Sequence, residues 1–352
     1  MVRGRWTLLV AGAAILAPGE AGASGLAVEV VPREAERRVD VLVSGKPFTS
    51  YVWPTTVMKP ILYPLRTASG KLLTRGYPLD PRPGERIDHP HHVGLWLNYG
   101  DVNGVDFWNN SPRSKDSARM GRIVHGKVEG TRGGPGEGEL EVSAEWRLPG
   151  DRPVLAERTR FVFAADGEAR LVDRVTTLTA LAERVLFKDN KEGLFGIRVA
   201  RALEHPATKA EILTDSAGRP TAVPVLDNAG VTGRYLSSEG KEGDAVWGTR
   251  GRWVALGGTV EGEAVTLAIL DHPGNPGHPT YWHARGYGLF AANPLGQQAM
   301  SGGKEELNFA LEPGASVTFR YRVLVLSAGP SPGLLEERYR AFAAEASGRE
   351  AR

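Results

Sequence analysis

The sequence has no cysteine among its 352 residues. This excludes disulfides, thiolate metal ligands, a cysteine nucleophile and a lipid-modified cysteine. The chain also lacks a block of basic residues, and its formal net charge is only +2, so its charge pattern does not favour nucleic acid as a partner. Without disulfides the fold depends on its hydrophobic core, and a hydrophobic fraction of 41% in a chain of this length is enough to build one.

Long apolar runs are absent except at the N-terminus. There Arg3 and Arg5 precede the apolar segment 6–17, and Ala21–Ala23 supplies small residues. A basic start, a short apolar run and a small-x-small site are typical of a secretory signal peptide, and about 12 residues are too few to span a bilayer. We predict a signal peptide over residues 1–23, a periplasmic or secreted protein, and no membrane span after signal removal. An uncleaved anchor is the alternative.

Short segments in which apolar and polar residues alternate follow from residue 25 onward. Segments 26–31, 38–43 and 48–52 show the period of two that half-buried strands have. Further strands are expected at 61–65, 72–77, 122–129, 140–148, 154–164, 169–178, 185–188, 196–201, 211–214, 253–260, 264–270, 288–292, 307–311 and 316–325. The pattern predicts a mainly β protein, a large antiparallel β-sandwich of two sheets.

One helix is expected, near the C-terminus. In residues 332–346 the apolar side chains of Leu334, Leu335, Tyr339 and Phe342 recur at helical spacing. No linker rich in serine or proline interrupts the chain. We therefore predict a single β-sandwich domain over residues 24–352 that ends in this helix.

Six of the eight histidines lie in two short stretches, Asp88–Trp108 and Asp271–Gly296. Such turn-rich, polar segments are typical of loops that carry function. In an extended conformation, His89 and His91 would point to one side of the first stretch and His92 to the other. They fit half of a metal site, an acid–base pair, or a loop in which the imidazoles only bond backbone groups.

The segment Lys188–Arg198 supplies further candidates. Glu192 is a potential base or metal ligand, or the ion-pair partner of Lys191. Arg198 alternates with apolar neighbours and so faces the opposite side from them. There a guanidinium can bind carboxylate or hydroxyl groups as a planar fork, unless it forms only a surface salt bridge.

In the second histidine stretch, Tyr281, His283 and Arg285 alternate as in a strand and share one side. Aromatic rings beside His and Arg suit a sugar, because its apolar faces stack and its hydroxyls need donors and acceptors. Tryptophans are often core residues, and asparagines beside prolines often only shape turns. The other candidates for substrate binding are Trp247, Asn275, His278 and Asn293.

Several motifs together resemble a bacterial family known under the names DUF6807 and "methane oxygenase PmoA". They are DHPHHVGLW (88–96), DVNGVDFW (101–108), KEGLFGIRVA (191–200), WGTRGRW (247–253) and the whole of 271–296. Where the family motif reads HHRGLW this chain has Val93, so the resemblance implies no positively charged side chain at that position. The family's oxygenase name does not fit a chain without membrane-spanning helices after its signal. The resemblance implies an exported β protein with a pocket, an association with sugar catabolism, and a mutarotase-like sandwich.

We therefore expect an exported enzyme that acts on a carbohydrate or modified sugar through hydrolysis, elimination or epimerisation. His89, His91, His92, Glu192 and His283 are the expected acid–base groups. A divalent metal is an open option, with His89, His91, Glu192 and His283 as its candidate ligands. The expected substrate-binding residues are Lys191, Arg198, Trp247, Asn275, His278, Tyr281, Arg285 and Asn293. The alternatives are a non-catalytic carbohydrate-binding protein and a periplasmic copper- or zinc-binding protein.

Overall fold

A computed structural model describes Met1 and residues 25–345 of the chain. The predicted signal peptide therefore lies outside the described residues, except for Met1, as does the last residue of the predicted helix 332–346. Within the part that is described, no helix is both long enough and apolar enough to cross a membrane.

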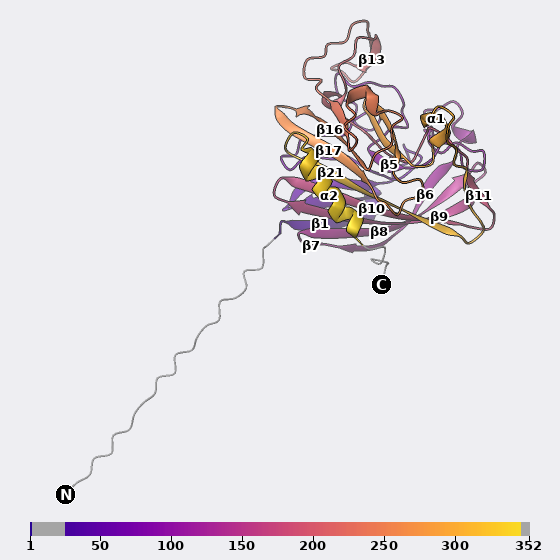
Figure 1. The fold of residues 1–352 in the computed structure, drawn as a ribbon, viewed down its shortest axis with the longest axis horizontal. Coiled ribbons are helices and arrows are strands. Elements are labelled where there is room, and N and C mark those ends of the chain that lie inside the picture. Colours follow the sequence, from indigo (N-terminus) through magenta and orange to yellow (C-terminus); the bar gives the residue numbers. More distant parts are fainter. Residues whose placement is uncertain (2–24, 346–352) are drawn as a thin grey trace.

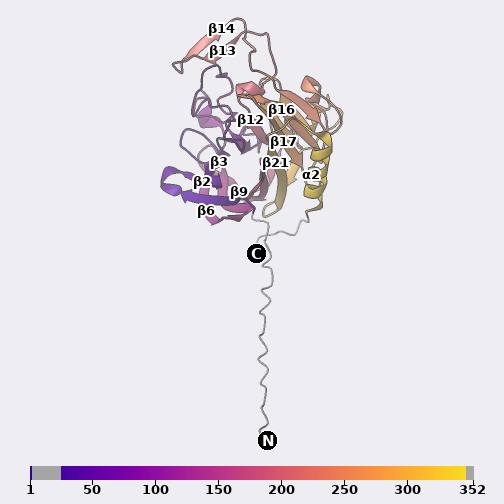
Figure 2. The same cartoon turned by 90° about the vertical axis from the view of Figure 1, so that its left-hand side faces the viewer.

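Two large antiparallel sheets form the body of the protein (Figures 1 and 2). The nine-stranded sheet has the order β18 (Tyr281–Arg285), β19 (Leu289–Asn293), β12 (Phe195–Arg198), β5 (Leu95–Leu97), β4 (Ile61–Leu62), β3 (Lys46–Val52), β2 (Arg38–Val43), β1 (Ala27–Arg33) and β7 (Gly134–Pro135). The eight-stranded sheet has the order β15 (Arg234–Ser237), β16 (Trp253–Val260), β17 (Glu263–Asp271), β21 (Ser316–Leu326), β10 (Ala169–Ala180), β9 (Arg152–Asp166), β8 (Glu137–Leu148) and β6 (Arg122–Arg132). The expectation of a mainly β sandwich is confirmed.

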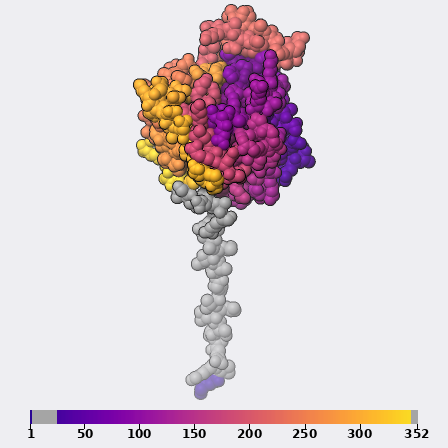
Figure 3. Space-filling model, turned by 90° about the vertical axis from the view of Figure 1, so that its right-hand side faces the viewer, coloured from indigo at the N-terminus to yellow at the C-terminus, as the bar shows by residue number. Residues whose placement is uncertain are grey.

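Smaller strands and helices lie outside these two sheets. Two small two-stranded sheets pair β11 (Val185–Phe187) with β20 (Phe309–Leu311) and β13 (Glu211–Thr214) with β14 (Pro220–Val223). The helices are α1 (Gln297–Met300), α2 (Pro332–Ala344) and the 3-10 turns η1 (Glu34–Glu36), η2 (Ser117–Arg119), η3 (Arg201–Leu203) and η4 (Gly243–Val246). Figure 3 shows the salmon-coloured part of the chain that includes β13 and β14 as a projection at one end, resting on purple segments from the first half.

The core lies between the sheets and is built by alternation. Along β8 every second residue is buried, as the period of two predicts. Side chains of β2 and β12, such as Val41 and Ile197, meet side chains of the opposite sheet, such as Trp146 and Phe161. Burying a side chain of this size stabilises the fold by about 1.5–3 kcal/mol, so this layer sets the positions of the strands.

The other face of the nine-stranded sheet also carries buried side chains. Leu95 and Leu97 of β5 enter the inter-sheet core, whereas Trp96 between them packs in a separate cluster with Val93 and Trp108. By the same alternation, Arg198 of β12 and His283 of β18 face this second side. The strands therefore present candidate residues from distant parts of the sequence on one surface.

The expected strands 154–164 and 169–178 form a hairpin of β9 and β10, with Asp166 paired to Ala169. The strand expected at 72–77 is absent: this segment forms only isolated bridges at Leu72 and Thr74. The chain turns there because the Gly76 N–H bonds the buried carboxylate of Glu85 and the Gly76 carbonyl accepts from Asp80. These bonds replace the ladder bonds of a strand.

Helix α2 covers the outer face of the eight-stranded sheet (Figure 1). Its buried side chains Leu335, Tyr339 and Phe342 pack against Trp253 and neighbouring sheet residues. Three of the four apolar positions that predicted this helix are thus the positions that hold it to the sheet, and the predicted C-terminal helix is confirmed.

Leu335→Ala should lower the free energy of unfolding by about 2–5 kcal/mol, because it removes a fully buried side chain and leaves a cavity under α2. Glu337→Ala, at an exposed position of the same helix, is the matched control and should change stability by less than about 0.5 kcal/mol. Urea denaturation of both variants checks this. Equal effects of the two would show that α2 is not docked as described.

Candidate functional site

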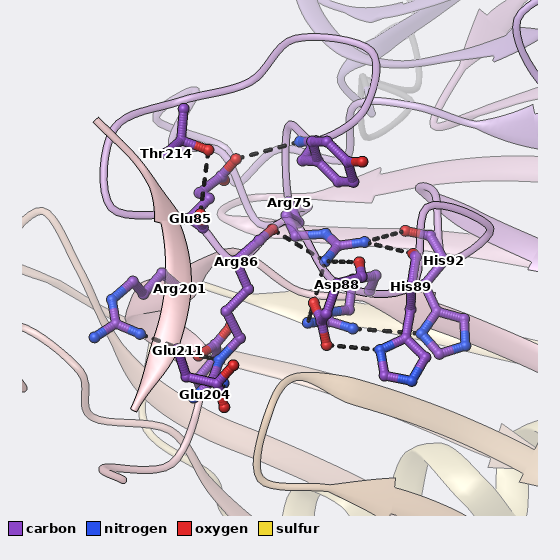
Figure 4. Close-up of polar contacts among 12 residues, drawn as sticks. Arg75, Glu85, Arg86, Asp88, His89, His92, Arg201, Glu204, Glu211 and Thr214 are labelled. Carbon is purple, nitrogen blue, oxygen red and sulfur yellow. Dashed lines mark hydrogen bonds and ion pairs between the residues drawn. The ribbon is translucent and has the colours of Figure 1, made fainter. Parts of the chain in front are cut away.

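Two arginines hold one carboxylate at the centre of the site (Figure 4). Asp88 Oδ1 accepts hydrogen bonds from Arg75, at 2.7 Å, and from Arg198, at 2.6 Å. Burial by itself raises the pKa of Asp88, but the hydrogen bond with His89 and the charges of Arg198 and Arg75 outweigh it and hold the pKa well below its usual range. Asp88 is therefore a carboxylate that only accepts hydrogen bonds.

Arg75 also fixes the backbone of the histidine loop. Its two terminal nitrogens donate to the backbone carbonyls of Arg86, Asp88, His89 and His92, at 2.8–3.2 Å. The planar guanidinium, with donors in a rigid fork, suits such a ring of acceptors. Burial and the neighbouring charge of Arg198 lower the pKa of Arg75 to about 9. The loop conformation therefore depends on a residue that the sequence patterns did not single out.

The histidine loop is a turn and not an extended segment, which corrects the prediction about its side chains. The His92 N–H bonds the carbonyl of His89 at 3.0 Å, and His89 has a positive φ of 43°. Pro90 occupies the turn position that its fixed φ favours. The rings of His89 and His92 consequently stack, with centroids 4.8 Å apart and planes 3° apart, where an extended segment would have separated them.

His89 is the exposed member of the cluster, with its side chain 41% accessible. Its Nδ1 lies 2.6 Å from Asp88 Oδ2. Because Asp88 can only accept, Nδ1 of the neutral ring carries the proton and Nε2 keeps its lone pair. Tyr287 stacks on this ring, at 5.1 Å and 3°. The arrangement leaves an oriented imidazole with a proton-accepting nitrogen that Asp88 does not engage.

His92 has the opposite tautomer. The guanidinium of Arg198 lies 3.3 Å from His92 Nδ1, and because it can only donate, Nδ1 accepts and Nε2 carries the proton. That Nε2 is buried and has no hydrogen-bond partner among the described residues. Burial and the nearby charge of Arg198 hold the pKa of His92 well below its usual range. His92 is therefore a neutral hydrogen-bond donor.

Beneath the cluster lies Lys59, another residue that the sequence patterns missed. Its ammonium donates to the carbonyl of His91 and to Asn110 Oδ1, both at 2.9 Å. Burial lowers the pKa of Lys59 to about 7. Burial and the charge of Lys59 lower the pKa of His91 to about 2. Lys59 thus positions His91 and keeps its ring neutral.

His283 belongs to the same site, across the ring of Trp108. The Trp108 centroid lies 5.6 Å from His92 and 6.5 Å from His283. His283 Nδ1 is 3.8 Å from Glu192 Oε2, too far for a direct hydrogen bond. Burial and the charge of Arg285 lower the pKa of His283 to about 3, so its ring is neutral.

Glu192 pairs with Lys191, at 2.9 Å. Asn293 holds their loop, because its amide donates to the carbonyls of Asn190 and Lys191 at 2.9 Å each. Asn293 Oδ1 remains buried without a partner among the described residues. Of these predicted site residues, Asn293 therefore positions the loop while Glu192 approaches His283.

Of the remaining predicted residues, some lie near His283 and others lie away from the histidine cluster. Arg285 lies over the ring of Trp247, at 4.6 Å, on the same side of β18 as His283. Asn275 and His278 do not join the cluster: both bond the buried carboxylate of Asp271, at 2.7 and 2.8 Å, and His278 reaches toward α2. Tyr281 stacks with Arg250, at 4.5 Å.

The described residues contain no group of three or more His, Asp and Glu arranged to hold a metal ion. The charges around the cluster explain why it does not suit a cation. Arg198 and Arg75 both bond Asp88, and Lys59 adds a buried ammonium under His91. A metal site formed by His89, His91, Glu192 and His283 therefore finds no support in this geometry.

A family model described as a family of unknown function, DUF6807, matches residues 38–340. The second name in the predicted resemblance, methane oxygenase PmoA, gains no support from this match. No curated protein matches the sequence.

Among solved structures, the chain is similar to a GH36 α-galactosidase from Geobacillus stearothermophilus, with 13% identity and a TM-score of 0.37, over 80% of this chain but only 40% of that one. It is also similar to a galactose mutarotase related enzyme from Lactobacillus acidophilus, with 9% identity and a TM-score of 0.33, over 86% of this chain and 99% of that one. The chemistry of the site, and not these distant structures, is therefore the basis for a function.

The buried histidines predict how stability depends on pH. The pKa values of His91, His92 and His283 are lowered in the folded state, so the unfolded chain binds more protons once pH falls below about 6.5. Above that pH the free energy of unfolding has its full contribution from these three rings. As pH falls toward their folded-state pKa values, the free energy of unfolding decreases by up to about 1.4 kcal/mol per pH unit for each ring.

We expect the free energy of unfolding to decrease from about pH 6.5 downward. His283→Gln should make this decrease per pH unit smaller, because one of the three rings no longer titrates. Chemical denaturation at a series of pH values measures both slopes. A stability that stays constant from about pH 7 to pH 5 would contradict the neutral, buried state of these rings.

Proposed function

The chain belongs to DUF6807, a family of unknown function, and from its site we propose an exported enzyme that acts on a carbohydrate or modified sugar by acid–base chemistry. The observation that carries the proposal is the pair formed by Asp88 and the exposed His89, whose Nδ1 is bonded at 2.6 Å. An imidazole oriented by a carboxylate is a general base with a defined proton-accepting nitrogen. Asp88 keeps its charge because Arg75 and Arg198 hold it.

Next to this base lies a hydrogen-bond donor. The Nε2–H of His92 has no partner among the described residues, and its ring stacks on His89 at 4.8 Å. That nitrogen is buried, so His92 acts on the site through its contact with the His89 ring and not by direct contact with a substrate. The exposed His89, oriented by Asp88 and stacked on a neutral ring, suits removal of a proton from a carbon next to a carbonyl or carboxylate.

Among the three expected reactions, this geometry favours epimerisation and elimination over hydrolysis. Glycoside hydrolysis ordinarily uses two carboxyl groups, one of them protonated. Asp88 is held as a carboxylate by two arginines, and Glu192 is paired with Lys191. Neither carboxyl is placed as a proton donor, whereas His89 is placed as a base.

The carbohydrate part of the proposal is supported by the aromatic rings. Tyr287 and Trp247 each lie under an arginine, Arg198 at 4.8 Å and Arg285 at 4.6 Å, and sugars combine ring stacking with hydrogen bonds to polar groups. The same rings would serve a non-catalytic carbohydrate-binding protein, which is the second candidate. Export is supported by the basic, apolar and small residues of segment 1–23.

The proposal predicts that the purified protein exchanges a carbon-bound proton of a sugar or sugar acid with solvent. ¹H NMR in D₂O measures the rate of this exchange. His89→Asn should slow exchange by about 10²–10⁴-fold and change stability by less than about 1 kcal/mol. Asparagine is the suitable replacement because His89 has a positive φ, which asparagine tolerates.

His125→Asn is the matched control, since His125 is also partly exposed and stacks on an aromatic ring, Trp53, at 3.9 Å, outside the site. It should leave the exchange rate unchanged. Binding of a sugar without any proton exchange or product would reject catalysis in favour of a binding protein. Full activity of His89→Asn would remove His89 from the mechanism.

A further inference from the structure

A cavity of about 520 Å³ lies beside the histidine cluster. Its walls include Arg86, Lys209, Glu211, Trp247, Arg285 and Tyr287. A volume of this size is within the range of about 300–1,000 Å³ that small-molecule sites occupy. The cavity is thus large enough for part of a sugar, and its polar lining differs from the core packing around it.

The cavity adjoins the proposed base through Tyr287 and shares a strand face with His283. Tyr287 lines it and stacks on the His89 ring at 5.1 Å. Arg285 lines it as well and lies two residues after His283 on β18, so both side chains leave the same face of the strand. A ligand in the cavity would therefore extend toward His89 along the ring of Tyr287.

Arg86 in the cavity wall is neutralised by carboxylates of the protein. Arg86 bonds Glu204 at 2.7 Å and also pairs with Glu211. His205 lies 3.1 Å from Asp244. Arg86 is therefore neutralised, whereas burial lowers the pKa of His205, so its neutral ring leaves the exposed carboxylate of Asp244 uncompensated.

Arg285 is different. Among the described residues it has no hydrogen-bonded or ion-paired acidic partner, and its guanidinium lies on the Trp247 ring, at 4.6 Å. Lys209, exposed in the same wall, likewise has no acidic partner among them. The Nε1–H of Trp247 is buried without a hydrogen bond. The wall thus presents two cations without an acidic partner, Arg285 and Lys209, together with the carboxylate of Asp244.

We propose that this cavity binds a negatively charged substituent of the sugar, a carboxylate or a sulfate or phosphate ester, with Arg285 as its principal ligand. The inference rests on the proposed function and names its substrate class. A guanidinium presents a planar fork of donors that matches the oxygens of these groups. Stacking on Trp247 fixes the plane of the fork before the ligand arrives.

Calorimetric titration with matched probes tests the inference: glucose and galactose against glucuronate, galacturonate, glucose 6-sulfate and glucose 6-phosphate. At least one charged probe should bind about 10–100-fold more tightly than its neutral parent. Which charged probe binds best distinguishes a carboxylate from an ester. About 1 M salt, where the Debye length is about 3 Å, should weaken only the charged probes.

Arg285→Met keeps an unbranched side chain on Trp247 and removes the charge, so it should abolish the preference for charged probes. Arg252→Met is the matched control, because Arg252 also lies over an aromatic ring, Tyr339 at 5.8 Å, beside α2; it should keep the preference. Equal affinity for charged and neutral probes overturns the inference. An unchanged preference for charged probes in Arg285→Met also overturns it. The same holds if no charged probe binds with a Kd of about 1 mM or lower.

The two proposals can fail separately. A preference for charged probes that depends on Arg285, without proton exchange in any of them, supports the anion site and rejects the catalytic proposal. Proton exchange that depends on His89 in a neutral sugar, with no preference for charge, supports the catalytic proposal and rejects the anion site.

Discussion

The site depends on how two buried guanidinium groups are neutralised. Arg75 and Arg198 both donate to one oxygen of Asp88, and each is almost inaccessible to water. A buried charge is tolerated only when it is paired and its donors are bonded. One carboxylate cannot balance two cations, and the terminal nitrogens of Arg75 also bond backbone carbonyls of the histidine loop. The turn conformation of that loop follows from this requirement.

The same charges divide one residue type into different chemical roles. His91 and His92 are buried beside cations, so they stay neutral and their rings act as fixed dipoles. His89 lies at the surface with its Nδ1 on Asp88, where water or a substrate can meet its other nitrogen. The division arises because the turn at Pro90 directs three histidines that are nearly consecutive into different surroundings. Burial and the charged neighbours, rather than the imidazole itself, therefore decide which ring can serve as a base.

Local alternation in the sequence was enough to predict the sandwich and helix α2, because those patterns reflect burial of one face at a time. It was not enough at 72–77, where the carboxylate of Glu85 takes the Gly76 N–H. The two histidine stretches stood out by composition, but the meeting of His92 and His283 depends on β12 joining β5 to β19, a non-local pairing that no local pattern encodes. Asp88 and Tyr287 lay inside the quoted motifs, whereas Arg75 and Lys59 gave no signal because nothing in their local sequence marks them as partners of distant carbonyls.

Arg86 connects the histidine loop to the adjoining cavity (Figure 4). Its carbonyl accepts from Arg75, and its side chain bonds Glu204 and Glu211 of the cavity region. The same residue pairs with Leu213 of β13, and its neighbours Glu85 and Gly84 bond Thr214. The cavity wall and the loop that carries His89 are thus joined by hydrogen bonds formed during folding. Since their donors and charges are arranged before any ligand arrives, the proposed reaction would need little reorganisation, which is the condition under which fixed dipoles stabilise a transition state most effectively.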